Sequence, residues 1–145
     1  MTPFSRLDEA GDMDVPQVAF VVFDGFQPLD LVGPHEVFGH AGYRCRIVAP
    51  RAGLVRSRSG LPVHAEYGVG DADPGDVDTL IVVGGAGVDE ARRDRALVEW
   101  VAAAGAGARR ATSVCSGVLL LAATGLLAGR RVTTHWRRRD CCRIE

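Results

Sequence analysis

Apolar stretches alternate along the chain with segments of helical periodicity. Residues 17–23 and 78–83 are dominated by apolar side chains, which is typical of strands covered on both faces of a parallel sheet. Residues 43–49 alternate between apolar and polar side chains, which also predicts a strand. Two shorter runs at residues 111–114 and 131–134 predict two further strands.

Three helices are predicted between these strands. Pro34 is placed to start a helix over residues 35–40, because proline suits the first helical position. A second helix covers residues 94–105, and a third covers residues 116–128 and ends at Gly129, which suits the left-handed conformation that follows a helix. The remaining segments are a small hairpin over residues 55–57 and 62–65, and a loop over residues 67–76.

Strands that alternate with helices predict an α/β fold with a doubly wound, mostly parallel sheet and helices on both faces. In such sheets, ligands bind beyond the carboxyl ends of the strands. Asp30, the glycine run at residues 84–87, Cys115 and His135 all follow predicted strands. We therefore expect these residues to converge on one rim of the sheet and to form a site there.

Cys115 lies in the segment 112–117, between an apolar run and a helical one. A cysteine flanked by small residues at a strand-to-helix junction resembles a nucleophile elbow, in which the side chain sits on a sharp turn above the next helix. The partial positive charge at that helix terminus predicts a stabilised thiolate and a reactive side chain. The alternative is a small buried cysteine without a chemical role, which is the commoner fate of a lone cysteine.

The other candidate residues also have structural interpretations. Asp30 suits a turn or a helix cap, and His135 suits packing against Trp136. The positions that we interpret as surface or structural are Glu36, His35, His40, His64 and the arginine run at residues 137–139.

Composition narrows the function classes. The 145 residues suffice for one domain with a core, and 47% hydrophobic and 24% charged residues are ordinary for a globular protein. A formal net charge of −1 argues against a general nucleic-acid-binding surface. The four cysteines lack metal-ligand spacing, and adjacent Cys141 and Cys142 make a poor disulfide framework. We expect no metal and no cofactor, and reduced thiols in a cytoplasmic protein.

The ends of the chain differ from its middle. Residues 1–16 are polar and acidic and lack the apolar core of a signal peptide, so we expect a disordered extension. No apolar run approaches the length of a membrane span, so we expect no membrane partner.

Four segments, taken in order, carry a family resemblance: residues 22–38, 82–87, 112–117 and 125–136. Together they resemble the PfpI superfamily, which has the class I glutamine amidotransferase-like, flavodoxin-like fold. The resemblance covers about residues 17–136, the extent that we expect for the domain.

The resemblance implies roles for individual residues. Cys115 matches the family's elbow cysteine, and Asp30 matches an acidic residue that hydrogen-bonds this thiol and moves a proton. Backbone N–H groups at Gly85 and Ser116 match an oxyanion-type pocket, and Ser116 stands where some members have a threonine whose hydroxyl faces the cysteine. His135 matches a histidine whose role varies, and we expect it to be auxiliary at most.

Within the superfamily, the motifs resemble two groups. One is the ligand-sensing domain of AraC-type transcriptional regulators, which the Ser116-Gly117 form of the motif favours. The other is isonitrile hydratase, a cysteine-dependent hydro-lyase that adds water to an isocyanide to give an N-substituted formamide. A redox-sensing or glyoxalase-like role and a non-functional fragment are also compatible with the same residues.

The resemblance ends after Trp136. The family continues with further helices and strands, whereas here residues 137–145 carry little apolar periodicity, so we expect an incomplete domain with an aberrant or truncated tail. No helix-turn-helix pattern follows, so we expect no direct nucleic-acid binding by this chain. The expected partners are a small-molecule ligand or substrate and a second copy, because dimers are common for this fold.

Overall fold

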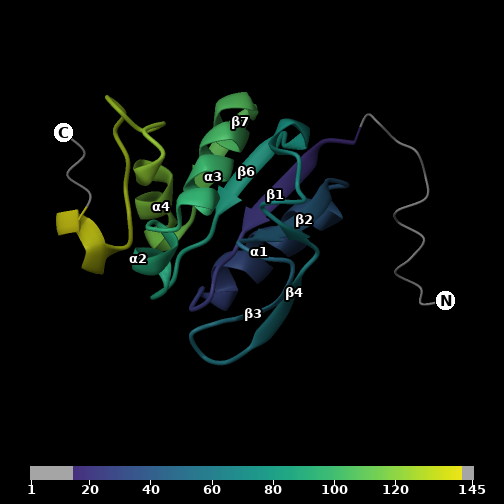
Figure 1. Ribbon diagram of the computed structural model, residues 1–145, viewed down its shortest axis with the longest axis horizontal. Helices are drawn as coiled ribbons and strands as arrows, with labels where there is room; N and C mark the ends of the chain where they lie inside the picture. The colour runs from purple at the N-terminus through teal and green to yellow at the C-terminus, as the bar shows by residue number, and fades with distance from the viewer. Residues whose placement is uncertain (1–14, 142–145) are drawn as a thin grey trace.

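The computed structural model describes residues 15–141 and has a central sheet of five parallel strands in the order β5-β2-β1-β6-β7. Figure 1 shows β2, β1 and β6 side by side in this sheet. These strands are β1 (Gln17–Val21), β2 (Arg44–Ala49), β5 (Tyr67–Gly68), β6 (Thr79–Val82) and β7 (Arg110–Ser113). A separate antiparallel pair consists of β3 (Gly53–Arg56) and β4 (Pro62–Ala65). The predicted α/β fold with a mostly parallel sheet is confirmed.

Helices connect the parallel strands and cover the sheet. The α-helices are α1 (Pro28–His40), α2 (Val88–Ala91), α3 (Arg95–Gly107) and α4 (Val118–Ala123), and the 3-10 helices are η2 (Pro74–Asp76), η3 (Cys115–Gly117) and η4 (Trp136–Cys141). From β1 the chain crosses through α1 to β2, and from β6 it crosses through α3 to β7, in the opposite direction along the sheet. Because such crossovers are right-handed, α1 and α3 lie on opposite faces.

The core follows from the central position of β1 and β6. Each has a parallel strand on both sides and helices on its faces, so its side chains are almost all buried. Phe20 of β1 packs against the rings of His35 and Phe38 from α1, at centroid distances of 5.4 and 6.4 Å. The continuous apolar runs of the sequence therefore correspond to strands without a solvent face.

Helix α1 begins earlier than predicted. Pro28 occupies its first turn, and Pro34, which we expected to start the helix, lies inside it. The Gln27 N–H before the helix donates to the Gly84 carbonyl oxygen at 2.8 Å, so a tertiary contact with the glycine run sets where the helix starts. This longer helix carries Asp30 in its first turn.

Helix α4 ends earlier than predicted, at Ala123 rather than residue 128. The Thr124 hydroxyl donates to the Leu121 carbonyl oxygen at 2.6 Å, and Gly125 adopts a left-handed φ of 81°. Gly125 thus ends the helix where we expected Gly129 to do so, because glycine takes this conformation without steric cost.

Other segments also differ from the predictions. Residues 131–134 form no strand; instead the Thr134 hydroxyl donates to the carbonyl oxygen of Cys115 at 3.3 Å. Tyr67 and Gly68, expected in a loop, pair with the edge of β2 as β5. The first 14 residues of the expected extension and the end of the expected tail after residue 141 lie outside the described residues. Within residues 15–141, no helix combines the length and apolar character that crossing a bilayer requires.

A substitution at Gly117 tests how closely α4 packs against the sheet. A Cβ at this position would lie 2.2 Å from the carbonyl oxygen of Val82, whereas its φ of −57° suits any residue. We expect Gly117→Ala to lower the free energy of unfolding by about 1–3 kcal/mol, because the added methyl group must displace strand backbone. Gly107→Ala is the control, since nothing lies within 4 Å of its added Cβ. Urea denaturation that shows equal effects for both variants would contradict this packing.

Candidate functional site

The carboxyl ends of β1, β6 and β7 meet at one rim, where the structure contains a cavity of about 530 Å³. Its lining residues are Gln27, Asp30, Arg58, Gly85, Ala86, Cys115, Ser116, His135, Arg137 and Arg138. β1 and β6 are neighbours whose crossovers leave in opposite directions, so the cavity lies at the topological switch point of the sheet. The structure thus brings together the four segments that carried the candidate residues.

Cys115 has an unusual backbone conformation. Its φ of 54° is the only positive value for a non-glycine residue between positions 15 and 141. The residue lies between β7 and α4, where the Gly117 N–H donates to the Val114 carbonyl oxygen at 2.9 Å and closes a tight turn. Left-handed conformation costs a residue with a Cβ about 1–2 kcal/mol, so the surrounding packing must impose it.

Asp30 meets Cys115 through the glycine run. The Gly84 N–H donates to Asp30 Oδ2 at 3.1 Å, and a side-chain hydrogen bond joins Asp30 to the Cys115 thiol. A Cβ on Gly84 would lie 2.9 Å from both Asp30 Oδ2 and Cys115 Cβ. Glycine at this position is therefore the condition for contact between the carboxyl group and the thiol.

Burial controls the protonation of this pair. Burial raises the pKa of Asp30, and the hydrogen bond from Gly84 and the thiol oppose that rise only in part. Burial also raises the pKa of Cys115; the nearby Asp30 carboxylate adds to this rise, and the Ser116 N–H opposes it. Burial and the adjacent carboxylate thus favour the neutral thiol and oppose the thiolate that we expected the helix terminus to stabilise, so the reactivity of Cys115 stays a prediction.

The backbone N–H groups of the expected oxyanion-type pocket already have partners. The Gly85 N–H donates to Ser116 Oγ at 3.0 Å, and the Ser116 hydroxyl donates to the Gly85 carbonyl oxygen at 3.3 Å. The Ser116 N–H donates to the Cys115 sulfur. The Ser116 side chain is buried and lies near the thiol. Its two hydrogen bonds with Gly85 link the glycine run to the turn that carries Cys115.

His135 lines the same cavity. Its Nδ1 accepts a hydrogen bond from the Arg137 N–H at 3.2 Å, and its ring lies against Trp136 at a centroid distance of 5.6 Å. His135 also favours the charged form of Asp30, though less than the other neighbours of that carboxyl group do. His135 therefore packs against Trp136, as its structural interpretation predicted, and also lines the cavity.

Several lining residues were missed by the sequence analysis. Gln27 and Arg58 come from a turn and a hairpin, and Arg137 and Arg138 come from the run that we interpreted as a solvated face. Arg138 donates from Nη2 to both carboxylate oxygens of Asp89 at 2.8 Å, which connects η4 to α2. The only sequence signal for these residues is the run of arginines after His135, which could have predicted a positively charged side of the cavity.

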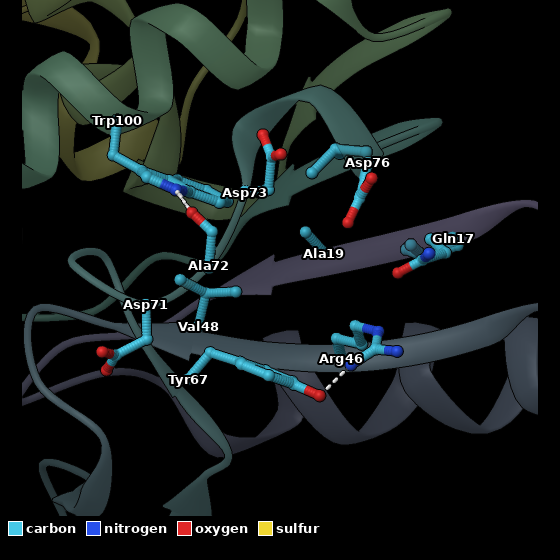
Figure 2. Close-up of a pocket in the computed structure, with 12 residues that line it drawn as sticks. Gln17, Ala19, Arg46, Val48, Tyr67, Asp71, Ala72, Asp73, Asp76 and Trp100 are labelled. Carbon is cyan, nitrogen blue, oxygen red and sulfur yellow. Dashed lines mark hydrogen bonds between the residues drawn. The ribbon is translucent and has the colours of Figure 1, made fainter. Parts of the chain in front are cut away.

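A second cavity of about 170 Å³ lies away from this rim, over β1, β2 and β5 (Figure 2). Trp100 and Tyr67 flank it with Val48 between them, and the Trp100 indole N–H donates to the Ala72 carbonyl oxygen at 2.8 Å. The Arg46 guanidinium contacts the Tyr67 hydroxyl and lies 4.9 Å from the centroid of its ring. Nothing in this cavity resembles the thiol and carboxyl pair at the rim, and no three His, Cys, Asp or Glu residues among positions 15–141 group as metal ligands.

The profile of the DJ-1/PfpI family matches residues 16–143, which includes every element of the cavity. The chain belongs to the DJ-1/PfpI family. A solved structure agrees with this assignment. A ThiJ/PfpI family protein from Pseudomonas syringae is 37% identical in sequence, and its superposition covers 97% of this chain and 57% of that protein's chain with a TM-score of 0.83.

Three relatives show which proteins this DJ-1/PfpI domain is similar to in sequence. An uncharacterized protein of Streptomyces lividans is 40% identical over 126 residues, 83% of this chain and 88% of the relative. Isonitrile hydratase of Pseudomonas putida is 36% identical over 125 residues, which are 86% of this chain and 54% of the enzyme. An HTH-type transcriptional regulator of Mycobacterium tuberculosis is 56% identical over 55 residues, 37% of this chain and 21% of the regulator. The chain therefore spans about half of the hydratase and a fifth of the regulator.

The effect of Asp30 on the thiol can be measured by the pH dependence of Cys115 alkylation. Because the Asp30 carboxylate raises the pKa of Cys115, we expect Asp30→Asn to lower that pKa and to speed alkylation by iodoacetamide at neutral pH. The increase should be roughly fivefold, the factor for two unit charges about 4 Å apart in water. Asp76→Asn, an exposed carboxylate at the second cavity, is the control. A slower reaction in Asp30→Asn would mean that Asp30 assists as a base instead.

Proposed function

We propose that this DJ-1/PfpI domain is the ligand-sensing part of an AraC-type transcriptional regulator. The cavity at the rim would hold a small molecule, and Cys115 and Asp30 would contact it. Support comes from the 56% identity to an HTH-type transcriptional regulator over 55 residues and from a cavity whose volume lies in the range of small-molecule sites.

One observation carries the preference for sensing over turnover: the Gly85 N–H is directed at Ser116 Oγ. An oxyanion pocket acts by aiming free N–H donors at the position where negative charge develops. Here the Gly85 N–H is satisfied within the protein, and the Ser116 N–H faces the sulfur. In addition, a resting thiol is a weaker nucleophile than a thiolate. A site arranged in this way suits reversible binding.

The second candidate is an isonitrile hydratase-like enzyme, which is favoured by the hydrogen bond between Asp30 and Cys115. Asp30 would accept the thiol proton while the sulfur attacks the isocyanide carbon, and would then deliver the proton to that carbon, giving a thioimidate. Water would add to the same carbon, and the carbon–sulfur bond would break, releasing the N-substituted formamide and the thiol. The identity of 36% over 86% of this chain also supports this candidate.

The cellular setting follows from the chemistry proposed. Cys45 and Cys115 are free thiols, and the site needs Cys115 in that form. We therefore place the protein in a reducing compartment, the cytoplasm.

A homodimer is part of the proposal. Helix α1 buries Leu31 against the sheet, yet it also exposes Leu29, Val32 and Val37, whose exposed fractions are 72%, 48% and 68%. A helix with apolar residues on both faces is typical of one that is covered on both. A second copy, packed α1 against α1 about a two-fold axis, would cover the outer face of both helices at once.

The two candidate functions are separated by incubation of the purified protein with an aryl isocyanide. As a sensor, the domain is expected to yield no formamide above the rate of Cys115→Ala. Formamide formation that disappears in both Cys115→Ala and Asp30→Asn would show that the hydratase is correct and the sensor wrong. Cys45→Ala is the control, because this second free thiol lies outside the cavity.

The proposed dimer is tested by sedimentation velocity over a range of concentrations. We expect Val37→Glu to shift the protein toward the monomer and to raise the dissociation constant about tenfold or more, because it introduces a charge into an apolar contact. Leu54→Glu on the β3–β4 hairpin is the matched control, since Leu54 has the same exposed fraction of 68% as Val37. A native protein that stays monomeric would sink this part of the proposal.

A further inference from the structure

The mouth of the Cys115 cavity carries an excess of positive charge. Arg58, Arg137 and Arg138 line it, and Asp30 is the single carboxylate among the described lining residues. Asp89 lies outside the lining and neutralises Arg138 through two contacts of 2.8 Å. No carboxylate between positions 15 and 141 compensates the guanidinium groups of Arg58 and Arg137 in this way.

Arg58 and Arg137 are positioned to meet a ligand. Both are exposed, and within residues 15–141 neither forms an ion pair. The Arg137 guanidinium lies over the Trp136 ring at 4.9 Å, an arrangement that orients the planar group and leaves its N–H edge available. The Arg58 backbone N–H donates to the Phe26 carbonyl oxygen at 3.1 Å, which anchors this residue beside the start of α1.

Burial falls from the interior of the cavity to its mouth. Cys115 and Asp30 are partly buried and Ser116 is buried, whereas Arg58 and Arg137 are exposed. A molecule that enters would therefore meet the two guanidinium groups first and the thiol and carboxyl pair last. Its inner part must be uncharged, because desolvating a further charge beside Asp30 and Cys115 would be costly.

We propose that the cavity binds a small organic anion, with its carboxylate held by Arg58 and Arg137 at the mouth and its uncharged part directed toward Cys115 and Asp30. The planar fork of a guanidinium matches a carboxylate in two parallel hydrogen bonds, which gives geometric selectivity as well as charge attraction. This inference rests on the proposed function, since it takes the cavity as a small-molecule site and adds the charge of the ligand. For a sensor the ligand is an organic acid, and for a hydratase it is an isocyanide that bears a carboxylate.

Two alkylating reagents of similar size but different charge test the electrostatic potential at the mouth of the cavity. Iodoacetate carries a carboxylate and iodoacetamide is neutral, so the ratio of their rates at Cys115 reports the local potential. The rates are measured on the folded chain by intact mass and peptide mapping, and the reference is the same cysteine in the urea-unfolded chain. Variants are Arg58→Gln, Arg137→Gln and the charge-conserving Arg137→Lys, with Arg51→Gln as the control, because Arg51 is exposed and lies outside the cavity lining.

We expect the iodoacetate to iodoacetamide ratio at Cys115 to be higher in the folded protein than in the unfolded chain. It should fall by about two- to threefold in Arg58→Gln and in Arg137→Gln, the effect of one unit charge several ångströms away in water. Arg137→Lys should retain the ratio, Arg51→Gln should leave it unchanged, and added salt should lower it by screening. A folded ratio no higher than the unfolded one, or one that neither glutamine variant lowers, overturns the proposal.

These outcomes are distinct from failure of the proposed function. The alkylation ratio depends on charge at the mouth and does not require that the cavity senses or converts its natural ligand. Formamide production would reject the sensor while leaving the ratio intact. If neither reagent labels Cys115 in the folded protein even at an alkaline pH that ionises the thiol, the cavity does not admit small molecules, and both the ligand class and the proposed function are wrong.

Discussion

The site depends on how closely the turn after β7 approaches the backbone that follows β6. Gly84 and Gly117 stand at the two contacts: a Cβ at Gly84 would lie 2.7 Å from the Ser116 nitrogen, and one at Gly117 would lie 2.2 Å from the Val82 carbonyl oxygen. Backbone can approach backbone at this distance only where a side chain is missing. The approach holds Cys115 in its left-handed conformation and presents the thiol to the Asp30 carboxyl group, which the first turn of α1 supplies.

The same closeness determines the electrostatics of the site. Packing three strand ends together excludes water from the thiol and the carboxyl group, and desolvation is the leading cause of the raised pKa of each. The hydrogen bonds from Gly84 and Ser116 are made within the protein, and they orient the pair without making the thiol an anion. The raised pKa of the thiol favours an uncharged sulfur beside the carboxyl group, an arrangement that either a binding site or a base-assisted nucleophile can use.

The cavity is completed by segments that the sheet does not hold directly. Arg58 comes from the turn of the β3–β4 pair, and Arg137 and Arg138 come from η4, after the irregular segment that follows α4. The Arg138–Asp89 ion pair connects η4 to α2, and the hydrogen bond from Thr134 to Cys115 connects the irregular segment to the cysteine turn. In this DJ-1/PfpI domain the sheet and its crossovers therefore position the thiol and carboxyl pair, while peripheral segments set the charge at the entrance of the cavity.

Most of the fold could be predicted from the sequence, because strand and helix periodicity, turn glycines and the order of elements are encoded in neighbouring residues. The continuous apolar run at residues 17–23 corresponds to buried β1, and the placement of Asp30, Gly84, Cys115 and His135 after predicted strands indicated a common rim. Only the tertiary structure decided where α1 begins, since a hydrogen bond from Gln27 to Gly84 sets that point. The protonation of Cys115 likewise depends on the balance between burial, Asp30 and the Ser116 N–H, which no local pattern records. The partner of the Gly85 N–H and the presence of Arg58 and Arg137 in the lining of one cavity also depend on distances between segments far apart in the chain, and those distances exist only once the sheet has formed.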